Sequence, residues 1–218
     1  MSLDVQSPDL TLAVIGCGVM GQGIAQIAAQ AGCRVLMLDA RPGAAESAKA
    51  AIAGTLAKLA ERGKIAQAGA DAAVALLNPV SAVADLAPAR IVIEAIVEAI
   101  DAKRQLLREL EAVVAGDCLI ATNTSSLSVT AIAAAAKQPG RVAGFHFFNP
   151  VPLMKVVEVI DGALTAPWVA PALTALARRM GHRPVKAKDT PGFLVNHAGR
   201  GYGTEALRIL SEGVADTT

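Results

Sequence analysis

The chain has 218 residues, of which 53% are hydrophobic and 18% are charged, and this composition excludes a disordered protein. Its 20 basic and 19 acidic residues nearly cancel, so no basic stripe is available for nucleic acid. The three cysteines, Cys17, Cys33 and Cys118, have neither the number nor the spacing of a disulfide framework or a zinc site. We therefore expect a reduced, cytoplasmic protein without a metal.

A membrane span is also disfavoured. Residues 10–33 carry no charge and are long enough to cross a bilayer, but five glycines and three glutamines interrupt them. The N-terminal segment MSLDVQSPDL has two acidic residues and no basic one, which is atypical of a signal peptide.

In chain order, an apolar strand at residues 10–15 is followed by a glycine-rich turn, a helix at 20–31 and a second strand at 34–38. Strands and helices then alternate: we expect helices at 44–62, 101–114, 168–180 and 194–211, and strands at 79–80, 90–93, 119–122, 141–146, 153–159 and 184–188. This alternation predicts an α/β fold with a parallel sheet covered on both faces. The Pro-Gly pair in residues 189–193 is a plausible domain boundary.

The turn after the first strand has the sequence GCGVMG and predicts a dinucleotide-binding loop. Gly16 permits the tight turn, Gly18 lets the backbone approach a pyrophosphate, and Gly21 lets helix and strand pack closely. Asp39 ends the second strand, where a carboxylate binds the ribose hydroxyls and favours NAD over NADP. Arg41 could instead reach a 2′-phosphate, although a solvated loop charge is the simpler interpretation. The glycines alone could also make only a compact turn.

Polar residues in the second half indicate a catalytic site. His146 lies among three phenylalanines at the end of a strand, where it could act as a general base. Glu158 interrupts an apolar strand, and a partner such as His146 would offset the cost of burying it. Ser125 lies in a loop after a strand, and Asn196 follows the boundary segment. Each residue also has a purely structural interpretation. His146 could be a hydrogen-bonded core histidine and Glu158 a surface charge on an edge strand. Ser125 could serve an ordinary turn, and Asn196 could begin a helix.

Taken together, these motifs resemble the L-3-hydroxyacyl-CoA dehydrogenases. The resemblance runs from about Leu10 to Gly213 and rests on GCGVMGQGIAQ, IVIEAIVE, ATNTSSLS, GFHFFNPVPLMKVVEVI and KDTPGFLVN. It implies a Rossmann-type, doubly wound, mostly parallel sheet over residues 1–188. Residues 189–218 would then form a linker and the first helix of a C-terminal helical domain, as in a piece of a longer protein.

The resemblance also implies roles for single residues. His146 would be the general base and Glu158 its partner, while Ser125 and Asn196 would contact the substrate. The NAD-contacting residues it implies are Gly16, Gly18, Val19, Met20, Gly21, Asp39, Glu98, Lys103, Ser125 and Asn149. Gly199, Gly201 and Gly203 depart from the family, which often has bulky apolar residues there, and they weaken the last helix.

The implied reaction is reversible, NAD-dependent oxidation of an L-3-hydroxyacyl-CoA to a 3-ketoacyl-CoA in acyl-CoA catabolism. The implied partners are the acyl-CoA substrate and a second copy of the chain, which would assemble through the C-terminal helix. Three alternatives stay open: a CoA-independent dehydrogenase of 3-hydroxy acids, an NAD-binding fragment with little turnover, and a structural or sensory protein that keeps only the fold.

Overall fold

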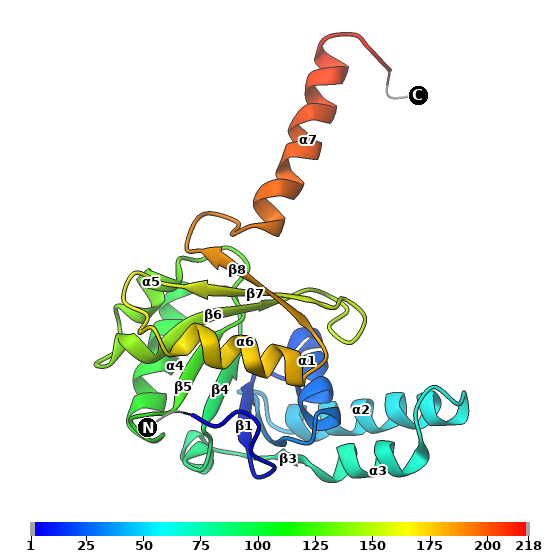
Figure 1. Ribbon diagram of the computed structural model, residues 1–218, viewed down its shortest axis with the longest axis vertical. Coiled ribbons are helices and arrows are strands. Elements are labelled where there is room, and N and C mark those ends of the chain that lie inside the picture. The colour runs from blue at the N-terminus through cyan, green and yellow to red at the C-terminus, as the bar shows by residue number, and fades with distance from the viewer. Residues whose placement is uncertain (1–2, 217–218) are drawn as a thin grey trace.

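A computed structural model describes residues 3–216 (Figure 1). Eight strands of this described part form one sheet in the order β3-β2-β1-β4-β5-β6-β7-β8. The strands are β1 (Thr11–Ile15), β2 (Arg34–Leu38), β3 (Leu77–Pro79), β4 (Ile91–Glu94), β5 (Leu119–Thr122), β6 (Val142–Phe147), β7 (Val156–Asp161) and β8 (Arg183–Lys188). The first six are mutually parallel, whereas β7 is antiparallel to β6 and β8 is parallel to β7. The predicted α/β class and mostly parallel sheet are confirmed.

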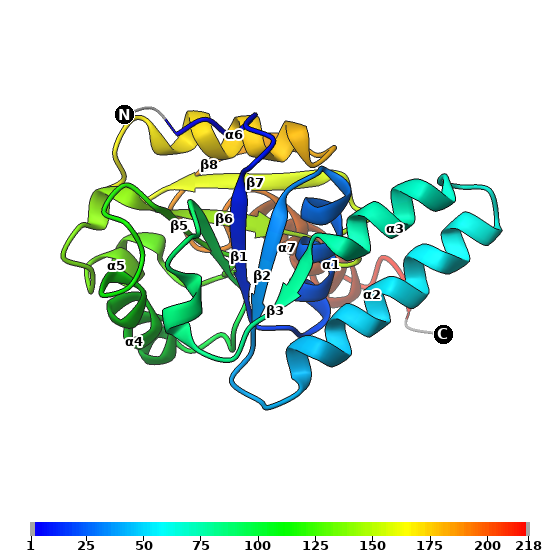
Figure 2. The same ribbon diagram turned by 90° about the horizontal axis from the view of Figure 1, so that it is seen from below.

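Helices cover both faces of the sheet. They are α1 (Val19–Gln30), α2 (Ala44–Glu61), α3 (Gln67–Ala75), α4 (Ile100–Glu111), α5 (Val129–Ala133), α6 (Val169–Arg179) and α7 (Val195–Ser211), with short 3₁₀ helices η1 (Val83–Leu86) and η2 (Pro139–Arg141). One core cluster joins the sheet to α1, α2, α3 and α6, and a second joins its other face to α4, α5 and η1. Figure 2 shows α1, α2 and α3 on one side of the sheet and α4 and α5 on the other. The central strands are therefore buried on both faces, which is why they read as continuous apolar runs.

Two details differ from the sequence prediction. The strand expected within 153–159 begins only at Val156 and extends to Asp161, because the chain first completes a turn at residues 151–153. The short helices η1, α5 and η2 were not expected. Their lengths of three to five residues leave too little hydrophobic periodicity to detect.

The last helix leaves the body of the domain. In Figure 1, α7 projects from the edge of the sheet beyond β8. None of its residues is buried, and Tyr202, Leu207 and Leu210 are all exposed. Within residues 3–216, no helix combines the length and the apolar character needed to cross a membrane.

Candidate active site

The glycine-rich loop connects β1 to α1 at the point where the strand order reverses, between β1 and β4. Gly16 has φ +90°, and a Cβ there would lie 2.5 Å from the Ala95 carbonyl oxygen. A Cβ on Gly21 would lie 1.7 Å from the carbonyl oxygen of Gly16. Any side chain at position 21 would therefore push α1 away from the loop. Gly18, in contrast, faces open space and caps α1 without a side-chain hydrogen bond. The first amides of α1 are therefore available to an anion.

Asp39 sits at the end of β2 beside this loop. Its Oδ2 accepts a hydrogen bond from the Cys17 N–H (2.7 Å), and its Oδ1 accepts from the backbone and Nε of Arg41 (2.9 and 3.1 Å). Partial burial alone would raise its pKa, but the hydrogen bonds from Arg41 and Cys17 hold the pKa below its ordinary value. Arg41 is therefore a solvent-exposed loop charge, with 73% of its side chain accessible, that also forms an ion pair with Asp39, and Asp39 stays ionised.

Two hollows meet at Asp39. One, of about 310 Å³, is lined by the glycine loop, Arg41 and Val97. The other, of about 390 Å³, is mostly apolar, with Val83, Ile96 and Leu106 among its lining residues. The site thus offers, side by side, the open amides of α1, the Asp39 carboxylate and an apolar hollow. These match the pyrophosphate, the ribose and the adenine of a dinucleotide in that order, so the residues fit NAD. The sequence reasoning missed the apolar hollow, because its walls come from β1, β2, η1 and α4, which are far apart in the sequence.

His146 and Glu158 are direct cross-strand neighbours on β6 and β7. Nδ1 of His146 lies 2.6 Å from Oε2 of Glu158, and the two residues are 5% and 0% exposed. The other carboxylate oxygen, Oε1, accepts the backbone N–H groups of Leu194 (2.9 Å) and Val195 (2.8 Å). Glu158 thus faces two backbone N–H groups and the His146 ring while shielded from solvent, and Nε2 is the ring nitrogen of His146 that this pairing leaves free.

A cleft of about 380 Å³ brings the remaining predicted residues to this pair. Its lining residues are Met20, Ala95, Ile96, Glu98, Asn123, Ser125, His146, Phe147, Phe148, Asn149 and Asn196. Of the predicted catalytic residues, only Glu158 is not at its surface, since it lies behind His146. Asn196 reaches across from α7, and its Nδ2 donates to the Ser125 carbonyl oxygen at 3.3 Å.

Two residues at or beside this cleft, Asn123 and Phe193, escaped the sequence reasoning. Asn123 accepts the Phe147 N–H at 2.9 Å through its side chain and so joins the end of β5 to β6. Phe148 and Phe193 flank the His146 ring, with centroids 4.5 and 5.8 Å away. The phenylalanine cluster in the sequence signalled the aromatic surroundings, but only the fold shows that Phe193 contributes to them.

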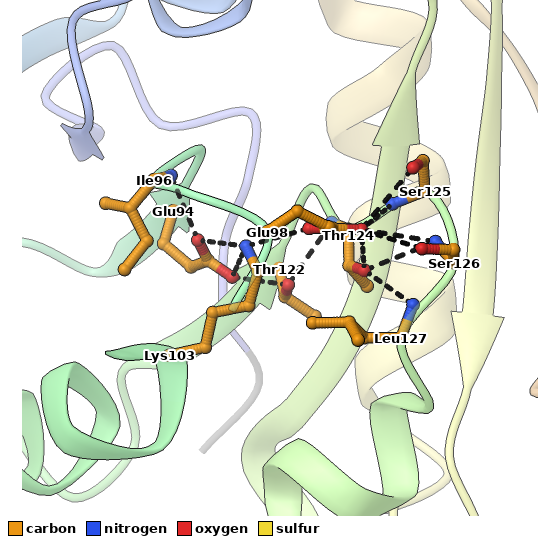
Figure 3. Close-up of polar contacts among 9 residues, drawn as sticks. All are labelled: Glu94, Ile96, Glu98, Lys103, Thr122, Thr124, Ser125, Ser126 and Leu127. Atoms are coloured by element: carbon orange, nitrogen blue, oxygen red, sulfur yellow. Dashed lines mark hydrogen bonds and ion pairs between the residues drawn. The ribbon is translucent and has the colours of Figure 1, made fainter. Parts of the chain in front are cut away.

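Glu98 organises the loop that carries Ser125 (Figure 3). Its Oε1 accepts hydrogen bonds from the Thr124 hydroxyl (2.6 Å) and from the Ser125 and Ser126 amides (2.9 and 3.3 Å). Partial burial would raise the pKa of Glu98, but these donors and the Lys103 ammonium lower it. Glu98 lines the cleft and, at the same time, fixes the serine loop.

Lys103 is not at the surface of the cleft. Its ammonium is 1% exposed and lies 2.9 Å from both oxygens of Glu94 and 3.4 Å from Oε2 of Glu98. Glu94 also accepts hydrogen bonds from the Thr122 hydroxyl and, at 3.2 Å, from the Ile96 N–H. Lys103 therefore does not line the cleft and is connected to it through its contact with Glu98.

Known proteins resemble this chain over nearly its whole length. Residues 11–190 match the family model "3-hydroxyacyl-CoA dehydrogenase, NAD binding domain". The 3-hydroxyadipyl-CoA dehydrogenase of Escherichia coli (strain K12) is 45% identical over 99% of the chain, and a probable 3-hydroxybutyryl-CoA dehydrogenase of Bacillus subtilis (strain 168) is 41% identical over 93%. The chain spans 44% of the first relative and 70% of the second. A crystal structure of 3-hydroxybutyryl-CoA dehydrogenase from E. coli K12 superposes with a TM-score of 0.92 at 44% identity, covering 95% of this chain and 44% of that one.

Proposed function

Because the chain belongs to the 3-hydroxyacyl-CoA dehydrogenase family, whose NAD-binding domain it contains, we propose that it interconverts an L-3-hydroxyacyl-CoA and a 3-ketoacyl-CoA with NAD as its cofactor. The observation that carries the proposal is the His146–Glu158 pair, which lies at the same cleft as the serine loop and the start of α1. A protein that kept only the fold would have no need of a buried carboxylate behind a cleft-facing histidine.

His146 is the proposed general base. Its Nε2 takes the proton of the substrate hydroxyl during oxidation and returns it during reduction. Glu158 keeps the imidazole in the tautomer that leaves Nε2 unprotonated, and its negative charge offsets the imidazolium that forms. Glu158 does so without water between the two groups, because it is 0% exposed.

Ser125 and Asn196 are proposed to hydrogen-bond the substrate oxygen, where charge changes during the reaction. Both residues line the cleft, and Nδ2 of Asn196 donates to the Ser125 carbonyl oxygen at 3.3 Å. Asn149, two residues after β6, contributes a further amide at the cofactor side.

NAD would be held by the open amides of Gly18, Val19 and Met20 at the start of α1 and by Asp39 at the ribose. When bound, NAD supplies a nicotinamide ring that accepts or donates the hydride. Glu98 would meet this ring from the segment between β4 and α4, with Lys103 as its buried counter-ion.

The test is oxidation of NADH by the purified chain with acetoacetyl-CoA, followed by absorbance. Acetoacetate without CoA is the matched control substrate. We expect turnover with the thioester and at least about tenfold lower kcat/KM with the free acid, since remote binding energy supports the chemical step. Equal rates with both would support a dehydrogenase of free 3-hydroxy acids and contradict the proposal.

A second candidate is an NAD-binding unit with little turnover of its own. The exposed surface of α7 favours it, because Asn196 is carried by a helix that buries none of its side chains. Cofactor binding measured by calorimetry, together with absent acetoacetyl-CoA reduction, would support this alternative over the first.

The organisation of the chain is also part of the proposal. We propose a domain boundary between Lys188 and Asp189, because β8 ends there and α7 buries none of its residues within the described part of the chain. We propose that copies of the chain associate through the apolar side chains of α7, including Leu207 and Leu210. We further propose a cytoplasmic location, supported by three free cysteines.

A further inference from the structure

Asp189 joins two segments that are far apart in the sequence. Its Oδ1 accepts the Val129 N–H at 2.9 Å, and its Oδ2 accepts the Thr130 N–H and the Ser128 hydroxyl, both at 2.8 Å. These three donors form the start of α5, immediately after the serine loop. Asp189 itself is the first residue after β8, so its carboxylate links the serine loop to the segment that leads into α7.

That segment, residues 190–194, turns sharply and places an aromatic ring in the core. Gly192 has φ +76° and Phe193 has φ +49°, a left-handed backbone conformation that is strained for a non-glycine residue. Phe193 is nevertheless 5% exposed and packs with Val129 and Ile160. Such a conformation persists only where the surroundings hold it. Asp189 on one side and the buried ring on the other supply that restraint.

The segment ends at the catalytic pair. The N–H groups of Leu194 and Val195 bind Oε1 of Glu158, whose Oε2 binds His146. One residue later, Asn196 binds the Ser125 carbonyl oxygen. Within residues 189–196, Asp189 therefore binds the start of α5, the next-to-last amides bind Glu158, and Asn196 binds the serine loop.

We propose that Asp189 is a positioning residue for the dehydrogenase site. By anchoring residues 189–196 to the start of α5, it fixes where the first amides of α7 meet Glu158 and where Asn196 faces Ser125. Asp189 does not line the cleft itself, so it acts through the residues that do. The part of this proposal that concerns turnover rests on the proposed function.

The carboxylate suits this role because it remains charged. Partial burial would raise the pKa of Asp189, but the hydrogen bonds from Thr130, Val129 and Ser128 lower it. Hydrogen bonds to a charged group are stronger than those to a neutral one. Three such bonds hold the segment more firmly than an asparagine side chain, whose single carbonyl oxygen is its only acceptor.

The test compares Asp189→Ala and Asp189→Asn with the unsubstituted chain by hydrogen–deuterium exchange at single amides. In Asp189→Ala, the amides of Val129 and Thr130 should exchange at least about tenfold faster, because they lose a charged acceptor. Leu194 and Val195 should also exchange at least about threefold faster, although their own acceptor, Glu158, is intact. Asp189→Asn should show the same pattern with smaller changes.

Asp85→Ala is the matched control. Asp85 accepts the Ser81 and Ala82 amides at 3.2 and 3.0 Å at the start of η1, so this variant removes a comparable cap that has no hydrogen bond to Glu158 or to the serine loop. It should leave the exchange of Leu194 and Val195 unchanged. In turnover, Asp189→Asn should lower kcat by about tenfold while the Kd of NADH changes less than about twofold, since the glycine loop and Asp39 are untouched.

Faster exchange at Val129 and Thr130 alone would overturn the proposal and leave Asp189 as a cap of α5. An unchanged kcat in Asp189→Asn would overturn it as well. Amide exchange requires no turnover, so a failure of the proposed reaction would appear as inactivity of the unsubstituted chain and would not alter the exchange result.

Discussion

His146 and Glu158 face each other across antiparallel strands, with Nδ1 and Oε2 2.6 Å apart and the glutamate shielded completely from solvent. The register of β6 and β7 alone creates this pair: a shift of one residue would move Glu158 to the opposite face of the sheet. The same carboxylate holds the first amides of α7.

From this pair we predict that His146→Ala lowers kcat by about 10²–10⁴-fold and leaves NAD binding nearly unchanged, because the general base is lost while the cofactor loop is intact. Steady-state kinetics and calorimetric titration with NAD measure the two quantities. An active His146→Ala protein would eliminate the proposed mechanism.

For Glu158→Gln, we predict a lower kcat and an acidic limb of the pH–rate profile displaced to lower pH. The imidazolium loses its counter-charge, so His146 gives up its proton more readily. A pH profile that keeps its shape, with only the amplitude reduced, would mean that Glu158 serves the structure and not the proton transfer.

Cofactor preference should follow Asp39. NAD should bind at least about tenfold more tightly than NADP, a difference of about 1.4 kcal/mol, because the ionised carboxylate repels a 2′-phosphate. Arg41 forms an ion pair with Asp39 and is thereby drawn away from such a phosphate. In Asp39→Ala the preference should shrink, since Arg41 is released. Equal affinities in the unsubstituted chain would mean that Arg41 dominates.

Acid should weaken the fold partly through Glu98. The pKa of Glu98 is lower in the folded chain than its ordinary value of 4.5. Ionised Glu98 therefore contributes fully to the unfolding free energy above pH 4.5, and this contribution is lost as the pH falls through the pKa of the folded chain. Glu98→Gln should therefore reduce the slope of unfolding free energy against pH between about pH 5 and 3. Urea titrations at each pH measure it. Glu61→Gln, at the exposed end of α2, should leave the slope unchanged, and identical slopes in both variants would refute the assignment.

Much of the fold was predictable because its signals are local. The strands β2 and β5 have the bounds that the sequence predicts for them, and the glycine loop lies between β1 and α1 as its motif requires. The pairing of His146 with Glu158 was also accessible, because a lone carboxylate in an apolar strand demands a partner. These features depend on residues close in sequence or on a strong energetic penalty.

Contacts between distant segments were not predictable in the same way. Asp189 caps α5 from about 60 residues away, and Lys103 contacts Glu94, a buried carboxylate at the end of β4, rather than lining the cleft. No periodicity or motif encodes such choices. They depend on which side chains the completed sheet brings together, and on the cost of leaving any buried charge without a partner.

The buried ion pair provides a stability prediction. Lys103→Met should destabilise the chain by about 3–5 kcal/mol, because Glu94 loses its cation while staying buried. The double variant Lys103→Met/Glu94→Gln should recover a large part of that loss, since the uncompensated charge is gone. Urea unfolding measures both. If the double variant were as unstable as Lys103→Met, lost packing rather than an unpaired charge would be the cause.

Two glycines in helices should respond to alanine in opposite directions. A Cβ on Gly23 in α1 would lie 2.7 Å from Cβ of Val151, in the turn that follows Asn149, whereas a Cβ on Gly54 in α2 would meet nothing within 4 Å. Gly23→Ala should cost about 1–3 kcal/mol, because the turn must move away from the helix. Gly54→Ala should gain about 0.5–1 kcal/mol from helix propensity alone. Because that turn follows Asn149 at the cleft, Gly23→Ala should also weaken NAD binding, while Gly54→Ala should not. Chemical unfolding and NAD titration of the two variants check both effects, and a neutral Gly23→Ala would show that the turn yields freely and does not fix Asn149.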